Sequence, residues 1–267
     1  MNEGLTKKNS YKAASSYEAL VLEYICSNLK KKQFKSIFNY FVNRNIKLIT
    51  HFGKVIKLQK KDNILDIGSG YLGNLNIYKF FKKKTVSIIE IEKEFILNCK
   101  LILKKIPLSV NFFNSNLASF KTRKKFNLVI CSKFLNIYNE AYQLRFLNKI
   151  SKISKKYILL IVMKEKSFIN IIFKILNKFQ LIRIFLSIFM KILGFVKFFD
   201  LLILLNFKKI QIMNLIFFLK SLLSNKFSVK RYVFAPQFYV EALEKNNFSL
   251  TNSFSDNTYK FLVFKKD

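Results

Sequence analysis

Apolar stretches of strand length alternate with segments of helical periodicity through the middle of the chain. Five runs have the length and the β-branched or aromatic content of strands: residues 62–67, 85–90, 109–113, 126–131 and 157–162. Residues 74–84 and 141–151 are instead typical of helices, and Phe80 and Phe81 are expected to pack on the sheet. Strands that alternate with helices predict a parallel sheet with helices on both faces.

The end of the chain has a different order of elements. Residues 237–247 are expected to form a helix, and residues 248–253 and 258–264 a pair of strands. Residues 231–234, just before Pro236, fit either a sixth strand or an extended segment that leads into the helix.

These patterns divide the chain into four segments. Residues 1–60 are charged and carry apolar residues at helical spacing, so we expect an N-terminal helical segment there. Residues 61–166 make the predicted core, residues 167–225 a hydrophobic, basic helical insertion, and residues 226–267 the C-terminal part of the sheet.

The insertion has an unusually wide apolar face. Its longest run without a charged residue, Ile210–Leu219, has ten residues, whereas a spanning helix needs about twenty. Its polar residues recur every three or four positions and leave most of the helix circumference apolar. Three ways of burying that face are open: a cap over an active site, a membrane interface with the basic residues toward anionic head groups, or a subunit interface.

A glycine-rich turn follows the first predicted strand. Residues 64–74 read Ile-Leu-Asp-Ile-Gly-Ser-Gly-Tyr-Leu-Gly-Asn, with Asp66 inside the apolar run. Glycine reaches unusual backbone angles and lets a ligand approach closely, and the following helix start offers unpaired N–H groups. Such a turn can hold a dinucleotide, with Glu90 on a ribose hydroxyl, or S-adenosylmethionine.

The turn resembles the first motif of the class I S-adenosylmethionine-dependent methyltransferases, hydrophobic-Asp-hydrophobic-Gly-x-Gly. Asp66 favours this interpretation, because a carboxylate so close to the glycines would crowd the phosphates of a dinucleotide but suits the cationic methionine end of a ligand without phosphate. The resemblance covers residues 60–165 well and residues 231–265 loosely. It implies an α/β, Rossmann-like doubly wound sheet of about seven strands with a C-terminal antiparallel strand, plus the helical insertion.

The resemblance also implies a cofactor-binding set. Glu90 would bind both ribose hydroxyls, with Glu92 as the alternative in register, and Ile91 would lie under the adenine ring. Asn116 and Leu117 stand where family members carry an Asp for the adenine amino group and an apolar neighbour. The full set is Asp66, Gly68, Ser69, Gly70, Glu90, Ile91, Asn116, Leu117 and Cys131.

The sequence identifies neither a catalytic base nor a metal site. His51, the single histidine, lies between two helical runs and has no obvious partner, and the three cysteines lack the spacing of metal ligands. Asn116, and Asn127 where the family often has Asp, depart from the pattern and motivate a third hypothesis besides the two enzymes below: a catalytically decayed scaffold at a membrane.

Charge and composition say less about function than these motifs do. The formal net charge is +33, and such a field favours polyanions such as nucleic acid or an anionic membrane face. Of the 48 basic residues, however, only five are arginine, the residue that most often binds phosphate groups in dedicated sites. An AT-rich genome would explain much of the excess of lysine, because lysine codons are AT-rich. Glu18 and Glu23 interrupt the region where a signal peptide would be apolar, so none is expected.

The sequence therefore predicts an S-adenosylmethionine-dependent methyltransferase for a small-molecule or lipid-linked acceptor. We expect a cytoplasmic protein, or one peripheral on the inner face of a membrane. The alternative enzyme is an RNA methyltransferase steered by the basic field, although no aromatic-rich RNA-binding module is recognisable.

Overall fold

The computed structural model describes residues 52–69, 74–82, 85–104, 108–132, 134–164, 232–255 and 259–267. The chain divides into two compact units: Leu22–Ser167 with Arg231–Asp267, and Met1–Val21 with Phe168–Lys230. The second unit lies wholly outside the described residues, as do His51, Gly70, Gly73, the insertion and the N-terminal segment before residue 52. The four-segment division made from the sequence stays a prediction.

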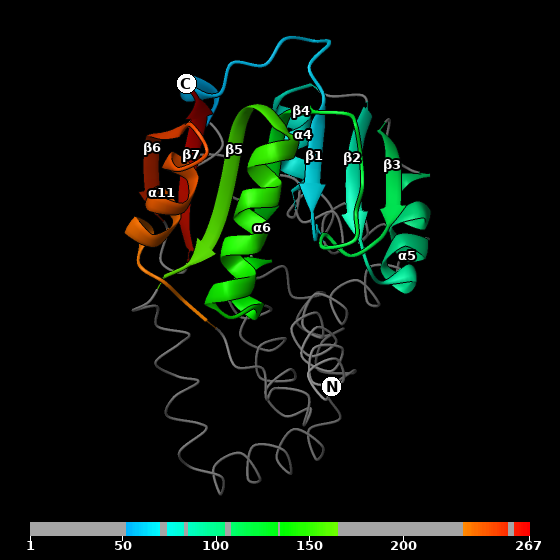
Figure 1. Cartoon of the computed structure of the whole chain (residues 1–267). Coiled ribbons are helices and arrows are strands. Elements are labelled where there is room, and N and C mark those ends of the chain that lie inside the picture. Colours follow the sequence, from blue (N-terminus) through cyan, green and yellow to red (C-terminus); the bar gives the residue numbers. More distant parts are fainter. Residues whose placement is uncertain are drawn as a thin grey trace, which may run out of the picture. The chain divides into compact units, whose positions relative to one another are not determined.

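The described part of the chain is built on one sheet of seven strands in the order β3-β2-β1-β4-β5-β7-β6 (Figure 1). The strands are β1 (Ile64–Ile67), β2 (Thr85–Glu90), β3 (Ser109–Asn114), β4 (Phe126–Ser132), β5 (Ser154–Met163), β6 (Phe248–Ser255) and β7 (Tyr259–Lys266).

Strand direction agrees with the expected fold. The first five strands pair in parallel, whereas β7 is antiparallel to both β5 and β6. This confirms the Rossmann-like sheet of seven strands with an antiparallel strand near the C-terminus. The order differs from the 3-2-1-4-5-6 order of dinucleotide-binding folds, because β7 is inserted between β5 and β6.

Helices cover both faces of the sheet. In Figure 1, α6 lies in front of the sheet and α4 behind it. The helix α11 packs against α6 and β6, and α6 packs against β4 and β5. The bounds are α4 (Leu75–Phe80), α5 (Lys93–Leu103), the 3-10 turn η1 (Leu135–Ile137), α6 (Glu140–Ile153) and α11 (Pro236–Glu244).

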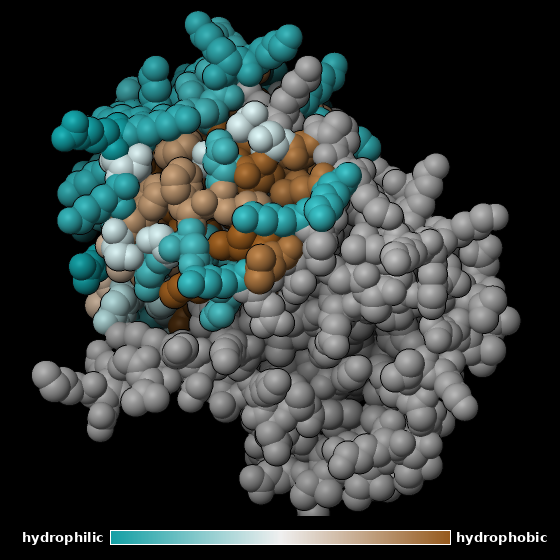
Figure 2. Space-filling view, turned by 90° about the vertical axis from the view of Figure 1, so that its right-hand side faces the viewer, coloured by the Kyte–Doolittle hydropathy of each residue, from teal (hydrophilic) through white to brown (hydrophobic). Residues whose placement is uncertain are grey.

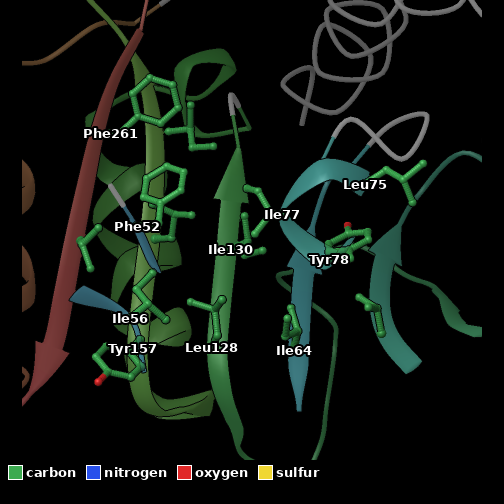
Figure 3. Packing of buried hydrophobic residues seen from close by; sticks show 14 of the residues in the cluster. Phe52, Ile56, Ile64, Leu75, Ile77, Tyr78, Leu128, Ile130, Tyr157 and Phe261 are labelled. Atoms are coloured by element: carbon green, nitrogen blue, oxygen red, sulfur yellow. The ribbon is translucent and has the colours of Figure 1, made fainter. Parts of the chain in front are cut away.

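The hydrophobic core on the α4 face combines this helix with residues from distant parts of the chain. Phe52 and Ile56 belong to the same cluster as Ile77 of α4, and Phe52 contacts the rings of Phe254 and Phe261 (Figure 3). Because side chains alternate along a strand, Ile64, Asp66, Ile88, Glu90 and Ile130 all belong to this face. Two acids thus share an otherwise apolar face of the sheet.

Several predicted boundaries are corrected. The helix expected over 74–84 ends at Phe80, because Lys82 adopts a left-handed conformation with φ 49°. The expectation for Phe80 was wrong, since its side chain is 39% exposed, whereas Phe81 does pack against the core.

Two further segments differ from the prediction. Residues 232–235 form no strand, which leaves the extended segment, and the helix expected over 237–247 ends at Glu244. Helical structure in the described end of the N-terminal segment covers residues 52–55 but not 56–60.

The turn after β1 depends on Gly68. Its φ is +64°, a conformation that costs side-chain-bearing residues about 1–2 kcal/mol. A Cβ placed on it would lie 2.8 Å from a ring carbon of Phe134, which is buried between β4 and η1. Gly68 therefore satisfies both a backbone and a packing requirement at the point where β1 ends.

We expect Gly68→Ala to lower the free energy of unfolding by at least about 1–2 kcal/mol, because it adds left-handed strain to the displacement of a buried ring. Denaturant titration measures it. Gly53→Ala is the matched control: its Cβ would meet the far end of the Phe80 ring, and Phe80 is 39% exposed and can swing aside. Equal losses in the two variants would contradict the role assigned to Gly68.

Candidate functional site

The carboxyl ends of four strands lie at one level of the sheet. Glu90 of β2 pairs with Asn114 of β3, and the N–H of Gly68 donates to the carbonyl of Ile89 at 2.9 Å. On the other side of β1, Ile67 is the register partner of Cys131 in β4. Since β1 is flanked by β2 and β4, the chain reverses its winding direction here, and ligands of open α/β sheets bind at such a switch point.

Asp66 is the buried acid of β1. Its side chain is 0% exposed, and its Oδ2 accepts hydrogen bonds from Nδ2 of Asn74 at 2.8 Å and from the hydroxyl of Tyr78. Its Oδ1 is also buried but has no hydrogen-bond partner among the described residues. One oxygen is thus saturated and the other is left for a donor from elsewhere.

The electrostatics of Asp66 oppose its charged form. Burial, reinforced by the charge of Glu90, outweighs the hydrogen bonds from Tyr78 and Asn74 and raises the pKa of Asp66 to about 7. No lysine or arginine of the described part of the chain contributes to this balance. A cationic donor would therefore gain more at this carboxylate than at an acid that is already paired.

Glu90 ends the neighbouring strand on the same face. Its side chain is 1% exposed, and its Oε1 accepts from the backbone N–H groups of Ile91 at 2.8 Å and Glu92 at 3.2 Å. These bonds fix the direction of the carboxylate. Glu92, the alternative in register, is only half-buried and directly precedes α5.

Apolar surface is exposed next to Glu90. Ile91 is 40% exposed and Phe113 of β3 is 38% exposed. Figure 2 views the molecule from the side on which β3 and α5 lie, and it shows apolar surface bordered by hydrophilic side chains. The ring of Phe113 is also in contact with Phe120, with centroids 5.2 Å apart. Ile91 directly follows Glu90, whereas Phe113, as the register partner of Ile89, belongs to the face of the sheet opposite that carboxylate.

Asn116 and Leu117 lie in the turn that follows β3. The Oδ1 of Asn116 accepts from the N–H of Ala118 at 2.9 Å, so this side chain shapes the turn. Leu117 is 1% exposed. The amide oxygen that the sequence assigned to an adenine amino group already has one donor and keeps one lone pair.

Cys131 differs from the two acids in orientation. As the register partner of Ile67, it belongs to the α6 face of the sheet, opposite Asp66 and Glu90. Burial, and then the charge of Asp66, raise the pKa of its thiol well above the usual range, so it is not a thiolate nucleophile. Ser69, next to Gly68, is 4% exposed, and its Oγ has no hydrogen-bond partner in the described part of the structure.

The sequence analysis did not predict two groups of buried polar residues. Asn74 and Tyr78 are one: the sequence places them one helical turn apart, but only the position of α4 over β1 brings both to Asp66. The other group is Asn136 and Gln143, on η1 and α6. Nothing in the sequence distinguishes these amides from the many other asparagines and glutamines of the chain.

Asn136 ties together the two described ends of the chain that flank the insertion. Its Oδ1 accepts from the N–H of Met163 at the end of β5 at 3.0 Å, and its Nδ2 donates to the carbonyl of Tyr232 at 3.3 Å. The N–H of Tyr232 in turn donates to the carbonyl of Asn136 at 2.8 Å. The chain therefore leaves and re-enters the described unit at the carboxyl edge of the sheet.

Gln143 completes this network. Its Nε2 donates to the carbonyls of Tyr138 at 2.8 Å and Tyr232 at 3.2 Å, and its Oε1 accepts from the hydroxyl of Tyr239 at 3.1 Å. Gln143 is 0% exposed, and its bond with Tyr239 is fully buried, whereas the two bonds to backbone carbonyls are partly buried. They hold the segment after β4 and the start of α11 in fixed positions beside the switch point.

Two features are absent from the described residues. None of the helices there is long and apolar enough to cross a membrane. In the same residues, no three His, Cys, Asp or Glu side chains gather closely enough to bind a metal ion.

Sequence comparison finds no relatives: no family model and no curated protein matches the chain. Solved structures do match. Magnesium protoporphyrin IX methyltransferase from Synechocystis, with bound S-adenosylhomocysteine, has a TM-score of 0.53 and 14% identity over 85% of this chain and 82% of its own. PKMT2 from Rickettsia typhi, in complex with the same compound, has a TM-score of 0.55 and 14% identity over 84% of this chain and 53% of its own.

A third match is an O-methyltransferase family protein from Burkholderia thailandensis, with a TM-score of 0.51 and 10% identity over 89% of this chain and 60% of its own. At sequence identities this low, the matches show a similar fold and nothing further. The chain has the fold of the class I methyltransferases, as the resemblance of its glycine turn implied.

We expect Asp66→Asn to stabilise the ligand-free protein at pH 8, by roughly 2–4 kcal/mol. The pKa of this acid rises on folding from 3.8 to about 7, and each unit corresponds to about 1.4 kcal/mol of cost to the ionised folded state. Because the folded protein holds the proton more tightly than the unfolded chain, this cost grows as the pH rises between those values and is constant above them.

Chemical denaturation of both proteins at several pH values measures the difference. It should shrink as the pH falls from 7 and vanish below about pH 4, where Asp66 is protonated in both states. A variant that is less stable than the wild type at pH 8 would contradict the unfavourable ionisation of Asp66.

Proposed function

Since the chain has the fold of the class I methyltransferases, we propose that it transfers a methyl group from S-adenosyl-L-methionine to a small-molecule acceptor. The observation that carries the proposal is the pair of buried acids on one face of the sheet. Among the described residues, one oxygen of Asp66 has no hydrogen-bond partner, and Glu90 ends the adjacent strand at the switch point. Their chemistry matches the two polar ends of a sulfonium nucleoside.

Each acid has a separate task in this proposal. The carboxylate of Glu90, fixed by two backbone N–H groups, would accept hydrogen bonds from the ribose hydroxyls. Asp66 would accept from the ammonium of the methionine part through its Oδ1. A cation at that position also relieves the repulsion between the two acids, which contributes to the raised pKa of Asp66.

The remaining predicted residues would form the walls of the site. Ile91 and Leu117 supply apolar area for the adenine ring, with Asn116 near its amino group. Gly68 and Ser69 begin the turn beneath the ligand, and Gly70 is proposed from the sequence alone. Cys131 is proposed only as a packing residue below the switch point, because its side chain belongs to the other face.

The bound cofactor would supply an electrophilic methyl group. The task of this chain is to hold that group in line with the acceptor and to exclude water. We assign no general base. A dinucleotide fits this site less well, because its phosphates would meet the buried carboxylate of Asp66, which has no basic partner among the described residues.

The acceptor is proposed at the level of its class. The matched structures include a methyltransferase named for magnesium protoporphyrin IX and an O-methyltransferase family protein, which favours a small molecule over a macromolecule. A lipid-linked acceptor and a location at the inner face of a membrane remain predictions from the sequence of residues 167–225.

We expect Glu90→Gln and Asp66→Asn each to weaken the binding of S-adenosylhomocysteine by about 1–3 kcal/mol, because each removes a charged hydrogen-bond acceptor. Isothermal titration calorimetry on the full chain measures the affinity. Glu92→Gln is the matched control, because it removes a partly buried acid two residues from Glu90 and should leave the affinity unchanged.

If Glu92→Gln reduced the affinity and Glu90→Gln did not, the ribose site would have to move by two residues. If neither Asp66→Asn nor Glu90→Gln changed it, both acids would be removed from the site.

A further inference from the structure

Two side chains of α4 converge on one oxygen of Asp66. Asn74 occupies the N-cap of this helix, where the side chain of an asparagine ordinarily accepts a bond from a backbone N–H of the first turn. Here it makes no capping bond and instead donates to Oδ2 of Asp66 at 2.8 Å. Tyr78, four residues later and therefore on the same side of the helix, donates to the same oxygen.

Tyr78 is an unusual donor because it lies in the hydrophobic core. Its side chain is 0% exposed and belongs to the same buried apolar cluster as Leu75 of α4 and Ile64 of β1 (Figure 3). A buried hydroxyl needs a hydrogen-bond partner, and Asp66 provides it. Burial and the neighbouring carboxylate raise the pKa of Tyr78 well above its ordinary value, so the phenol keeps its proton and remains a donor.

The arrangement leaves the two oxygens of Asp66 in opposite situations. Oδ2 has two donors, whereas Oδ1 has none in the described residues although it is equally buried. A lone asparagine or tyrosine could let the carboxylate rotate and exchange its oxygens. Two donors fixed on one helix hold Oδ2 against α4, so Oδ1 remains the oxygen available to a ligand.

We propose that Asn74 and Tyr78 are positioning residues for the cofactor: together they orient the carboxylate of Asp66 and keep it ionised for the ammonium of the methionine part. The inference rests on the proposed function. It goes further by assigning the selectivity for a charged amino-acid group, and the pH range of binding, to a pair of residues that do not touch the ligand.

The groups around Asp66 support this assignment. The titratable groups that interact electrostatically with Asp66 are Tyr78 on α4, Glu90 on β2 and, from the other face of the sheet, Cys131 on β4. Cys99 of α5 interacts in the same way with Tyr78. Burial and Glu90 raise the pKa of Asp66, and the contributions that lower it come from Tyr78, Asn74 and the backbone of Ile67. No cation of the described residues acts on Asp66. The two side-chain donors therefore contribute most to stabilising its charged form.

The test compares two probes that differ only at the relevant end. S-adenosylhomocysteine carries the amino-acid group, and 5′-methylthioadenosine shares the nucleoside and thioether but lacks it. Calorimetric titrations of the full chain between pH 5.5 and 8.5 should show wild-type affinity for S-adenosylhomocysteine falling below about pH 7, where Asp66 is protonated. Affinity for methylthioadenosine should stay constant.

In Tyr78→Phe, loss of one donor to the ionised carboxylate should move this pH midpoint upward by about one unit. Affinity for S-adenosylhomocysteine should then drop about 5-fold at pH 7 and largely recover at pH 8.5, with methylthioadenosine unaffected. Asn74→Ala is the second variant and should shift the midpoint in the same direction. Its side chain makes no capping bond, so the helix loses little.

Equal losses for both probes at every pH would mean that the two residues only maintain the structure, and would overturn the inference. So would a midpoint that neither variant moves while the wild type binds S-adenosylhomocysteine. A wild-type protein that binds neither probe would instead overturn the proposed function itself, so the two failures are distinguishable.

Discussion

A carboxylate buried without a cation is the constraint on which the candidate site depends. The chain carries a formal charge of +33, yet Asp66 has no basic partner among the described residues. Burying an isolated charge costs free energy. Among the described residues, two neutral donors from one helix, and no ion pair, offset this cost at Asp66. Oδ1 still lacks a hydrogen-bond donor among the described residues, and a cationic ligand could supply one.

The two faces of the sheet hold different parts of the candidate site. The α4 face holds both acids and the donors that orient Asp66, within a core that is otherwise apolar. The α6 face holds the amide network of Asn136 and Gln143, which fixes the segment after β4 and both described ends of the chain beside the insertion. Gly68 lies between the two, at the turn where a side chain would collide with Phe134.

Much of the sheet could be predicted from the sequence because its strands are compact apolar runs between polar turns. The prediction for β2 agrees with the structure at both ends, and those for β3 and β4 each differ by one residue. The parallel pairing of the first five strands was predicted from their alternation with helices. The antiparallel strand was predicted through the resemblance alone, since no local pattern places β7 between β5 and β6. The early end of α4 at Phe80 was missed because the left-handed conformation falls on a lysine, Lys82, rather than on a glycine.

The candidate site was predictable only in part, for a related reason. In the sequence Asp66 stands out as an acid inside an apolar run and Glu90 as the acid that ends one, and the structure buries both on one face. Asn74 and Tyr78 read locally as a helix cap and an apolar position, and their contact with Asp66 depends on where α4 lies on the sheet. Cys131 was grouped with the acids by its position along the strand, whereas alternation turns it to the other face.

The most direct test of the central claim is a calorimetric titration of the wild-type full chain with S-adenosylhomocysteine, and separately with NAD, at pH 8. The account predicts saturable binding of one S-adenosylhomocysteine per chain and no binding of NAD, whose phosphates Asp66 would repel. Binding of NAD in its place, or heat from neither ligand, would contradict it.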